Sequence, residues 1–137
     1  MIDKQAIDDF LAREFPQCRS TVESVGDRQA VLRHRVTDDD LRPGGTVSGP
    51  TLTAVADIAL YVALLGEIGI VPLAVTTSLS VNFLRKPSPQ RDLVAHCRLI
   101  KVGRTLAVGE VNLYSDGRDE PVAHVVGTYS IPPGQAG

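Results

Sequence analysis

One carboxylate stands out among the residues that could do chemistry. Asp57 is the only charged residue between Pro50 and Gly66, in a segment made mostly of apolar residues. Burying an unpaired carboxylate is costly, so Asp57 needs either a hydrogen-bonded partner or a chemical role. Two interpretations stay open here. It is a structural Asp bonded to nearby backbone or to a partner subunit, or it is a nucleophile or general base.

A glycine-rich loop leads directly into the same segment. The loop reads GGTVSG at 44–49 and precedes Pro50, a residue that the first turn of a helix tolerates. Free N–H groups at a helix N-terminus stabilise negative charge on a carbonyl oxygen. A carbonyl bound by the Gly49 N–H would lie near Asp57, and this pair is the minimum for acyl transfer. The alternative is that the glycines only shape a turn.

Two loop motifs are excluded by single residues. Residues 44–51 have the spacing of a phosphate-binding loop, but Pro50 stands where the Lys is required. We therefore reject nucleoside triphosphate binding by this loop. Ser48 lies in Gly-x-x-Ser-Gly and not in the Gly-x-Ser-x-Gly of a nucleophile elbow.

The sequence predicts no metal site. His34, His96 and His124 lie on separate predicted strands without the spacing of metal ligands, so we expect them to be solvated or structural. The acidic run Asp38-Asp39-Asp40 lacks the rest of a calcium-binding loop, and we expect a solvated turn there.

The composition narrows the class of protein. The 137 residues suffice for one domain, and 14 Lys and Arg against 16 Asp and Glu give a charge of −2. A hydrophobic fraction of 43% supports a core, while weak acidity and the absence of Trp disfavour nucleic-acid binding. Cys18 and Cys97 are too few for a disulfide framework. Without a signal, transit or membrane-spanning pattern, we expect a cytoplasmic protein with no membrane partner.

Two helices are predicted by hydrophobic periodicity. Residues 3–15 form a short amphipathic pattern that ends at Pro16, so we assign 1–16 to an N-terminal helix. Residues 51–66 are apolar on every side of a helix, which means that this helix is buried on every side. The simplest way to surround it in a chain of this length is to wrap a sheet around it.

The rest of the chain supplies such a sheet. Strands are expected at 18–25, 29–36, 75–83, 92–99, 104–114 and 122–131. Their period-2 patterns and short turns predict antiparallel pairing. We therefore predict a single α+β domain over 1–137, with a long central helix wrapped by an antiparallel sheet of five to six strands. Residues 132–137 are expected to be a flexible tail.

The ordered motifs between about Leu41 and Ile131 resemble the hotdog-fold thioesterases of the phenylacetate-pathway (PaaI-like) type. That family typically has Asn-Pro-x-Gly-Thr-Val-His-Gly-Gly, followed nine residues after the His by an acidic residue in a helix. This chain has RPGGTVSGP at 42–50, and Asp57 lies nine residues after Ser48. Three later segments also resemble the family: TTSLSVNFLRKP at 76–87, VGRTLA at 102–107, and the last strand with Val122-Ala123 and Gly127-Thr128-Tyr129.

The resemblance implies an acyl-CoA thioesterase that hydrolyses its substrate to free acid and CoA. It implies a homodimer or a dimer of dimers with the site at the dimer interface, and no cofactor beyond the CoA of the substrate. Asp57 would be the nucleophile or general base, and the Gly49 N–H would polarise the thioester carbonyl. Thr76 would help to place the water. Ser48, at the position of the family's His, completes the candidate catalytic residues.

Eight residues are candidates for substrate binding. Arg85, Lys86 and Arg104 are expected near strand ends or turns, where they could bind the CoA phosphates. Tyr61 could shape the acyl pocket. The uncharged polar face of Thr76, Ser78, Ser80 and Asn82 suits a site or an interface, or is an ordinary solvated sheet face. The full set is Arg42, Pro50, Tyr61, Asn82, Arg85, Lys86, Arg104 and Thr105.

Three departures from the family pattern motivate rival hypotheses. Arg42 replaces the family's Asn, Ser48 its His, and Pro50, which has no N–H, its second Gly. Loss of an oxyanion donor could cost about 10²–10³ in rate. The runner-up hypothesis is therefore a non-catalytic acyl-CoA binding protein. A hotdog hydratase or dehydratase ranks last, because it needs a His that neither the loop nor the central helix contains.

Overall fold

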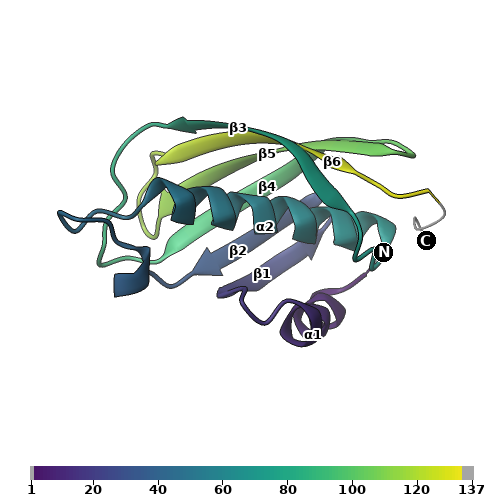
Figure 1. Cartoon of the computed structure of the whole chain (residues 1–137), viewed down its shortest axis with the longest axis horizontal. Helices are drawn as coiled ribbons and strands as arrows, with labels where there is room; N and C mark the ends of the chain where they lie inside the picture. Colours follow the sequence, from purple (N-terminus) through teal and green to yellow (C-terminus); the bar gives the residue numbers. More distant parts are fainter. Residues whose placement is uncertain (1, 134–137) are drawn as a thin grey trace.

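A computed structural model describes residues 2–133 (Figure 1). The chain order is α1 (Lys4–Glu14), β1 (Ser20–Gly26), β2 (Gln29–His34), a single 3₁₀ turn (Asp38–Asp40), α2 (Gly49–Ile68), β3 (Val75–Phe83), β4 (Leu93–Val102), β5 (Leu106–Ser115) and β6 (Ala123–Ser130). The part of the expected tail at 134–137 lies outside the described residues.

The six strands form one antiparallel sheet in the order β1-β2-β4-β5-β6-β3. The sheet bends around α2, which lies across its concave face and packs against every strand (Figure 1). The predicted α+β architecture is therefore confirmed. Strands β1 and β3 are the two edges of the sheet, and the first turn of α2 points toward the end of β3.

Helix α2 is longer than predicted because its caps extend it. The Ser48 side chain accepts a hydrogen bond from the Thr51 N–H at 3.2 Å, which starts the helix at Gly49. Gly69, with φ of +98°, ends it. The helix is long enough to span a membrane, and its mean hydropathy of 1.6 is also that of a membrane span. Most of its residues are, however, buried inside the fold.

Glycines on two strands let α2 approach the sheet closely. A Cβ added to Gly109 or Gly127 would lie 2.7 Å or 2.5 Å from a methyl carbon of Leu60. Leu60 is fully buried between these positions. Only glycine leaves room there for a close-packed helix.

A β-bulge in β3 changes which side chains face α2. Thr76 pairs with Tyr129, and the register shifts before the next pair, Ser78 with Thr128. One extra residue reverses the alternation of faces, so Thr76 points toward α2, whereas Ser78 lies on the opposite, exposed face. The expectation that Thr76 shares one polar face with Ser78, Ser80 and Asn82 is wrong for this reason.

Helix α1 lies next to the edge strand β1 and contacts both β1 and α2 (Figure 1). Its N-cap Asp3 accepts a hydrogen bond from the Ala6 N–H at 2.9 Å, and the helix ends at Glu14, shortly before Pro16. Its buried residues are Ile7, Phe10 and Leu11. The amphipathic pattern predicted at 3–15 is thus confirmed to within about one residue at each end, and the helix is shorter than the segment 1–16 assigned to it.

Candidate active site

Asp57 lies on α2 and is held by two hydroxyl groups. Its Oδ1 accepts a hydrogen bond from the Thr76 hydroxyl at 2.6 Å and from the Tyr129 hydroxyl at 2.7 Å. The Tyr129 hydroxyl also lies 3.0 Å from the Asp57 carbonyl oxygen. Among the described residues, Oδ2 accepts no hydrogen bond, so one oxygen of the carboxylate is fixed and the other is available for chemistry.

Tyr129 is a site residue that sequence reasoning missed. Its ring stacks against Tyr61, with ring centroids 6.1 Å apart, and the Tyr61 hydroxyl donates to the Pro72 carbonyl at 3.2 Å. Burial, together with the hydrogen bond to the Asp57 carboxylate, raises the pKa of Tyr129 well above its usual value. Tyr129 therefore stays protonated and remains a hydrogen-bond donor to Asp57.

The glycines of the loop have two different tasks. Gly44 and Gly45 have φ of +98° and +82° and form the turn that brings the Arg42 N–H to the Thr46 carbonyl at 2.9 Å. The turn interpretation is correct for these two. Gly49 is instead the first residue of α2, so its N–H has no acceptor within the helix, and the described residues supply none outside it.

Three cavities meet at Asp57. One, of about 550 Å³, is lined by Gly49, Pro50, Thr53, Ala54, Asp57 and Phe83. A second, of about 340 Å³, lies beside Tyr61, Thr76 and Tyr129. A third, of about 460 Å³, runs between α2 and the segment that joins α1 to β1. Gly49 and Asp57 thus line the same cavity, and the exposed ring of Phe83 lies close to Gly49.

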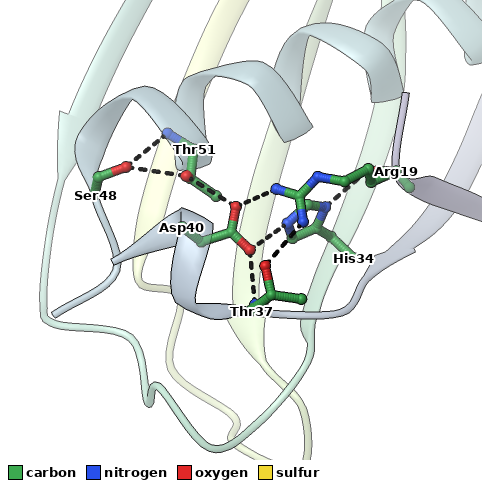
Figure 2. A network of polar contacts seen from close by, with 7 residues as sticks. Arg19, His34, Thr37, Asp40, Ser48 and Thr51 are labelled. Atoms are coloured by element: carbon green, nitrogen blue, oxygen red, sulfur yellow. Dashed lines mark hydrogen bonds and ion pairs between the residues drawn. The ribbon is translucent and has the colours of Figure 1, made fainter. Parts of the chain in front are cut away.

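Ser48 lines the 460 Å³ cavity and not the one beside Gly49, and its hydroxyl bonds to its own helix. Its hydroxyl donates to the Thr51 hydroxyl at 2.9 Å and accepts from the Thr51 N–H (Figure 2). This geometry is that of a helix N-cap. The sequence alone favours Ser48 or Gly49 as the cap, because both residue types are preferred there and Pro50 follows, and the structure shows that it is Ser48.

The acidic run is not a solvated turn at Asp40. Asp40 is 1% exposed, and its carboxylate accepts hydrogen bonds from Arg19, His34, Thr37 and Thr51 (Figure 2). The solvated-turn expectation is therefore wrong for this residue, because its partners come from β2, from the α1–β1 segment and from α2. Within residues 2–133, no cluster of His, Cys, Asp and Glu has the geometry of a metal site.

The candidate substrate residues fall into separate groups. Pro50 and Tyr61 line cavities at Asp57, while Asn82 is exposed on the outer side of β3 and Arg42 is exposed in the glycine turn. Arg85, which forms an ion pair with Glu120 at 2.9 Å, and Lys86 line a cavity of about 330 Å³ just after β3.

Arg104 and Thr105 lie in the turn between β4 and β5, at the far end of the sheet. Leu106, the next residue, pairs with Ser130, which pairs with Val75 at the start of β3. Within one protomer, the two groups of cations therefore lie at opposite ends of β3.

Comparisons with known proteins identify the family and the fold of the chain. The profile of a family described as the thioesterase superfamily matches residues 44–122. A candidate thioesterase from Silicibacter sp. TM1040 is 44% identical; the match covers 97% of this chain and 94% of that one, with a TM-score of 0.89. No curated protein sequence matches the chain.

Two further solved structures share the fold. A mutant of the phenylacetic acid degradation protein PaaI from Thermus thermophilus is 25% identical over 91% of this chain and 100% of that one, with a TM-score of 0.75. A hypothetical thioesterase from Streptococcus pneumoniae TIGR4, solved with coenzyme A, is 22% identical over 96% and 99%, with a TM-score of 0.79. The expected resemblance to the PaaI-like thioesterases is confirmed, and the chain belongs to the thioesterase superfamily with a hotdog fold.

Proposed function

We propose that the protein hydrolyses an acyl-CoA thioester to a free acid and CoA. The observation that carries the proposal is that Gly49 and Asp57 line one cavity. The Gly49 N–H has no acceptor among the described residues, and the Asp57 carboxylate is held through one oxygen only. Membership in the thioesterase superfamily supports the reaction class. The bound coenzyme A of the Streptococcus pneumoniae relative supports CoA as the thiol.

The reaction needs one polarised carbonyl and one base or nucleophile. The Gly49 N–H and the N-terminal end of the α2 dipole stabilise the oxyanion that forms when the thioester carbonyl is attacked. Asp57 Oδ2 either takes a proton from the attacking water or itself attacks to form an acyl intermediate that water then hydrolyses. In both routes the carbon–sulfur bond breaks, the CoA thiolate takes up a proton, and the acid keeps an oxygen from water.

Thr76 and Tyr129 orient Asp57 for either route. Both hydroxyls lie on Oδ1, at 2.6 Å and 2.7 Å, and fix the rotamer of the side chain. Because the charge of a carboxylate strengthens such hydrogen bonds, they hold Oδ1 firmly and leave Oδ2 to react. Pro50 supplies no N–H, so Gly49 carries carbonyl polarisation alone in this proposal.

We further propose that a second copy of the chain completes the site. Strand β3 is an edge strand; Val75 and Phe83 at its two ends are 54% and 57% exposed, and Leu84, directly after it, is 48% exposed. An uncovered apolar edge strand favours pairing with another strand. A partner bound along β3 would lie over the cavity at Gly49 and Asp57. It could also bring its own Arg104 or Lys86 close enough for the CoA phosphates.

Thiol release from short, long and aromatic acyl-CoA thioesters tests the proposal, with the acid product identified by mass spectrometry. We expect turnover of at least one acyl class. If no compound releases thiol but the same acyl-CoA compounds raise the melting temperature of the protein, the result would favour the non-catalytic binding protein. That alternative is favoured by the helix-capping use of Ser48 and by Pro50 in the first turn of α2, which has no N–H to donate.

A further inference from the structure

Asp40 is the centre of a buried polar network beside the start of α2 (Figure 2). Its Oδ1 accepts from Arg19 Nη2 and from the Thr51 hydroxyl at 3.2 Å. Its Oδ2 lies 3.1 Å from His34 Nε2 and accepts from the Thr37 N–H at 2.9 Å. Burial alone would raise the pKa of Asp40, but the hydrogen bonds from Thr37, Arg19 and His34 lower it to about 2. Asp40 is therefore ionised at neutral pH.

This network fixes the chain on both sides of Gly49. The Asp40 carbonyl accepts from the Ser48 N–H at 2.8 Å, and its carboxylate accepts from the Thr51 hydroxyl at 3.2 Å. Ser48 and Thr51 are joined to each other by two more hydrogen bonds, at 2.9 Å and 3.2 Å. Gly49 lies between these two anchored residues, although nothing in the network touches Gly49 itself.

We propose that Asp40 is a positioning residue that aims the Gly49 N–H at the carbonyl of the substrate. This inference rests on the proposed function. An oxyanion donor is effective only when it is held in place before the reaction, and a displacement of about 1 Å can cost about 10² in rate. A glycine has no side chain that could fix it, so its neighbours must do so.

The charge of Arg19 makes this arrangement compatible with the reaction. A lone carboxylate at this end of α2 would oppose the negative charge that develops at Gly49. Arg19 forms an ion pair with Asp40 and also donates to the Thr37 hydroxyl at 3.1 Å. The network thus supplies rigid hydrogen bonds while Arg19 offsets the charge of the group that accepts them.

Thr51→Val is the most selective test, because it removes one hydroxyl, keeps the shape of the side chain and leaves the Asp40 ion pairs intact. We expect kcat to fall by about 10-fold with little change in KM, since substrate contacts are untouched. Thr51→Ser keeps the hydroxyl and should restore kcat.

Asp40→Asn removes the charge and one acceptor oxygen. Four donors converge on the carboxylate, and an amide cannot accept from all of them. We expect a loss of about 10² in kcat. The control is Asp92→Asn, since the Asp92 carboxylate accepts from Arg33 at 3.2 Å outside this network; its kcat should match that of the wild type.

Amide hydrogen exchange at Ser48, Thr51 and Leu52, whose N–H groups are hydrogen-bonded on either side of Gly49, supplies a readout that does not depend on turnover. We expect Thr51→Val and Asp40→Asn to accelerate exchange at these three amides while the strands stay protected. The inference is overturned if folded Thr51→Val retains both the wild-type kcat and the wild-type exchange. If the wild type turns over no thioester, the proposed function fails, and the exchange result alone decides whether Asp40 orders this loop.

Discussion

At the scale of single residues, the two oxygens of Asp57 differ. Oδ1 accepts from the hydroxyls of Thr76 and Tyr129, whereas Oδ2 accepts no hydrogen bond among the described residues. Asp57 and Gly49 line the same cavity. A hydrogen bond to a charged group contributes about 1.5–3 kcal/mol, so each hydroxyl restrains the carboxylate strongly. The residues that orient Asp57 should therefore affect rate more than substrate affinity.

The substitution Tyr129→Phe tests this division of labour. It removes one donor to Asp57 and keeps the ring that stacks on Tyr61. We expect kcat to fall by about 10-fold, with KM little changed. Steady-state kinetics on the preferred thioester would measure both. Tyr114→Phe, on the outer side of β5 against His96, is the control, and equal kinetics of the two variants would contradict the role of Tyr129.

The sequence was sufficient to select Asp57 and Gly49 but not Tyr129. A lone charge in an apolar helix and a glycine at its start are local patterns that need no tertiary information. Tyr129 lies 72 residues from Asp57, and its contact depends on the register of β6 against β3. In the sequence it is simply one aromatic residue of a strand, with no spacing that links it to Asp57.

The contacts of Asp40 could not be predicted from the sequence either. The sequence at 38–40 has only the composition of a solvated turn. Its partners lie 21, 6 and 11 residues away, at Arg19, His34 and Thr51, and only the fold brings them together.

The Asp40 network should also appear in the pH dependence of stability. The pKa of Asp40 is lowered from 3.8 to about 2 in the folded chain. A lowered pKa stabilises the fold above the unfolded value, and this contribution is lost as pH falls from about 4 toward 2. Urea unfolding across this range should show the wild type losing stability more steeply than Asp40→Asn. Parallel curves would contradict the buried, ionised state of Asp40.

At the scale of elements, the caps of α2 fix where the helix begins and ends, and Gly109 and Gly127 beneath it allow it to pack closely on the sheet. The helix and all six strands were predictable, because their periodicities are strong. The bulge in β3 was not, since Val75, Thr77 and Leu79 continue a regular alternation in the sequence. That single extra residue turns Thr76 toward Asp57, so the polar residues of β3 lie on both faces of the strand and not on one.

The substitution Gly127→Ala tests the close packing of α2 on the sheet. The new Cβ would lie 2.5 Å from Leu60 and 2.7 Å from Leu79, so buried side chains must move. Overpacking of this kind costs about 1–3 kcal/mol in the free energy of unfolding. Chemical denaturation would measure the loss. Ser80→Ala, at an exposed position of β3, should leave stability nearly unchanged, and a similar effect of both substitutions would argue against tight contact at Gly127.

At the scale of the whole molecule, the site is open along β3. The apolar residues exposed on this edge predict self-association there. We expect Val75→Asp with Leu84→Asp to shift the protein toward monomer in sedimentation velocity and to lower activity together with association. Ile100→Asp, on β4 and 51% exposed in the wild type, is the control. A fully active monomer would contradict a site completed by a second copy.

The most direct test of the central claim compares the wild type with Asp57→Asn on the thioester that the wild type prefers. The amide keeps the size of the side chain but can neither accept a proton from water nor attack the carbonyl. We predict a loss of about 10²–10⁴ in kcat, with circular dichroism and thermal stability close to those of the wild type. A folded Asp57→Asn that retains wild-type turnover would show that Asp57 is not the catalytic carboxylate.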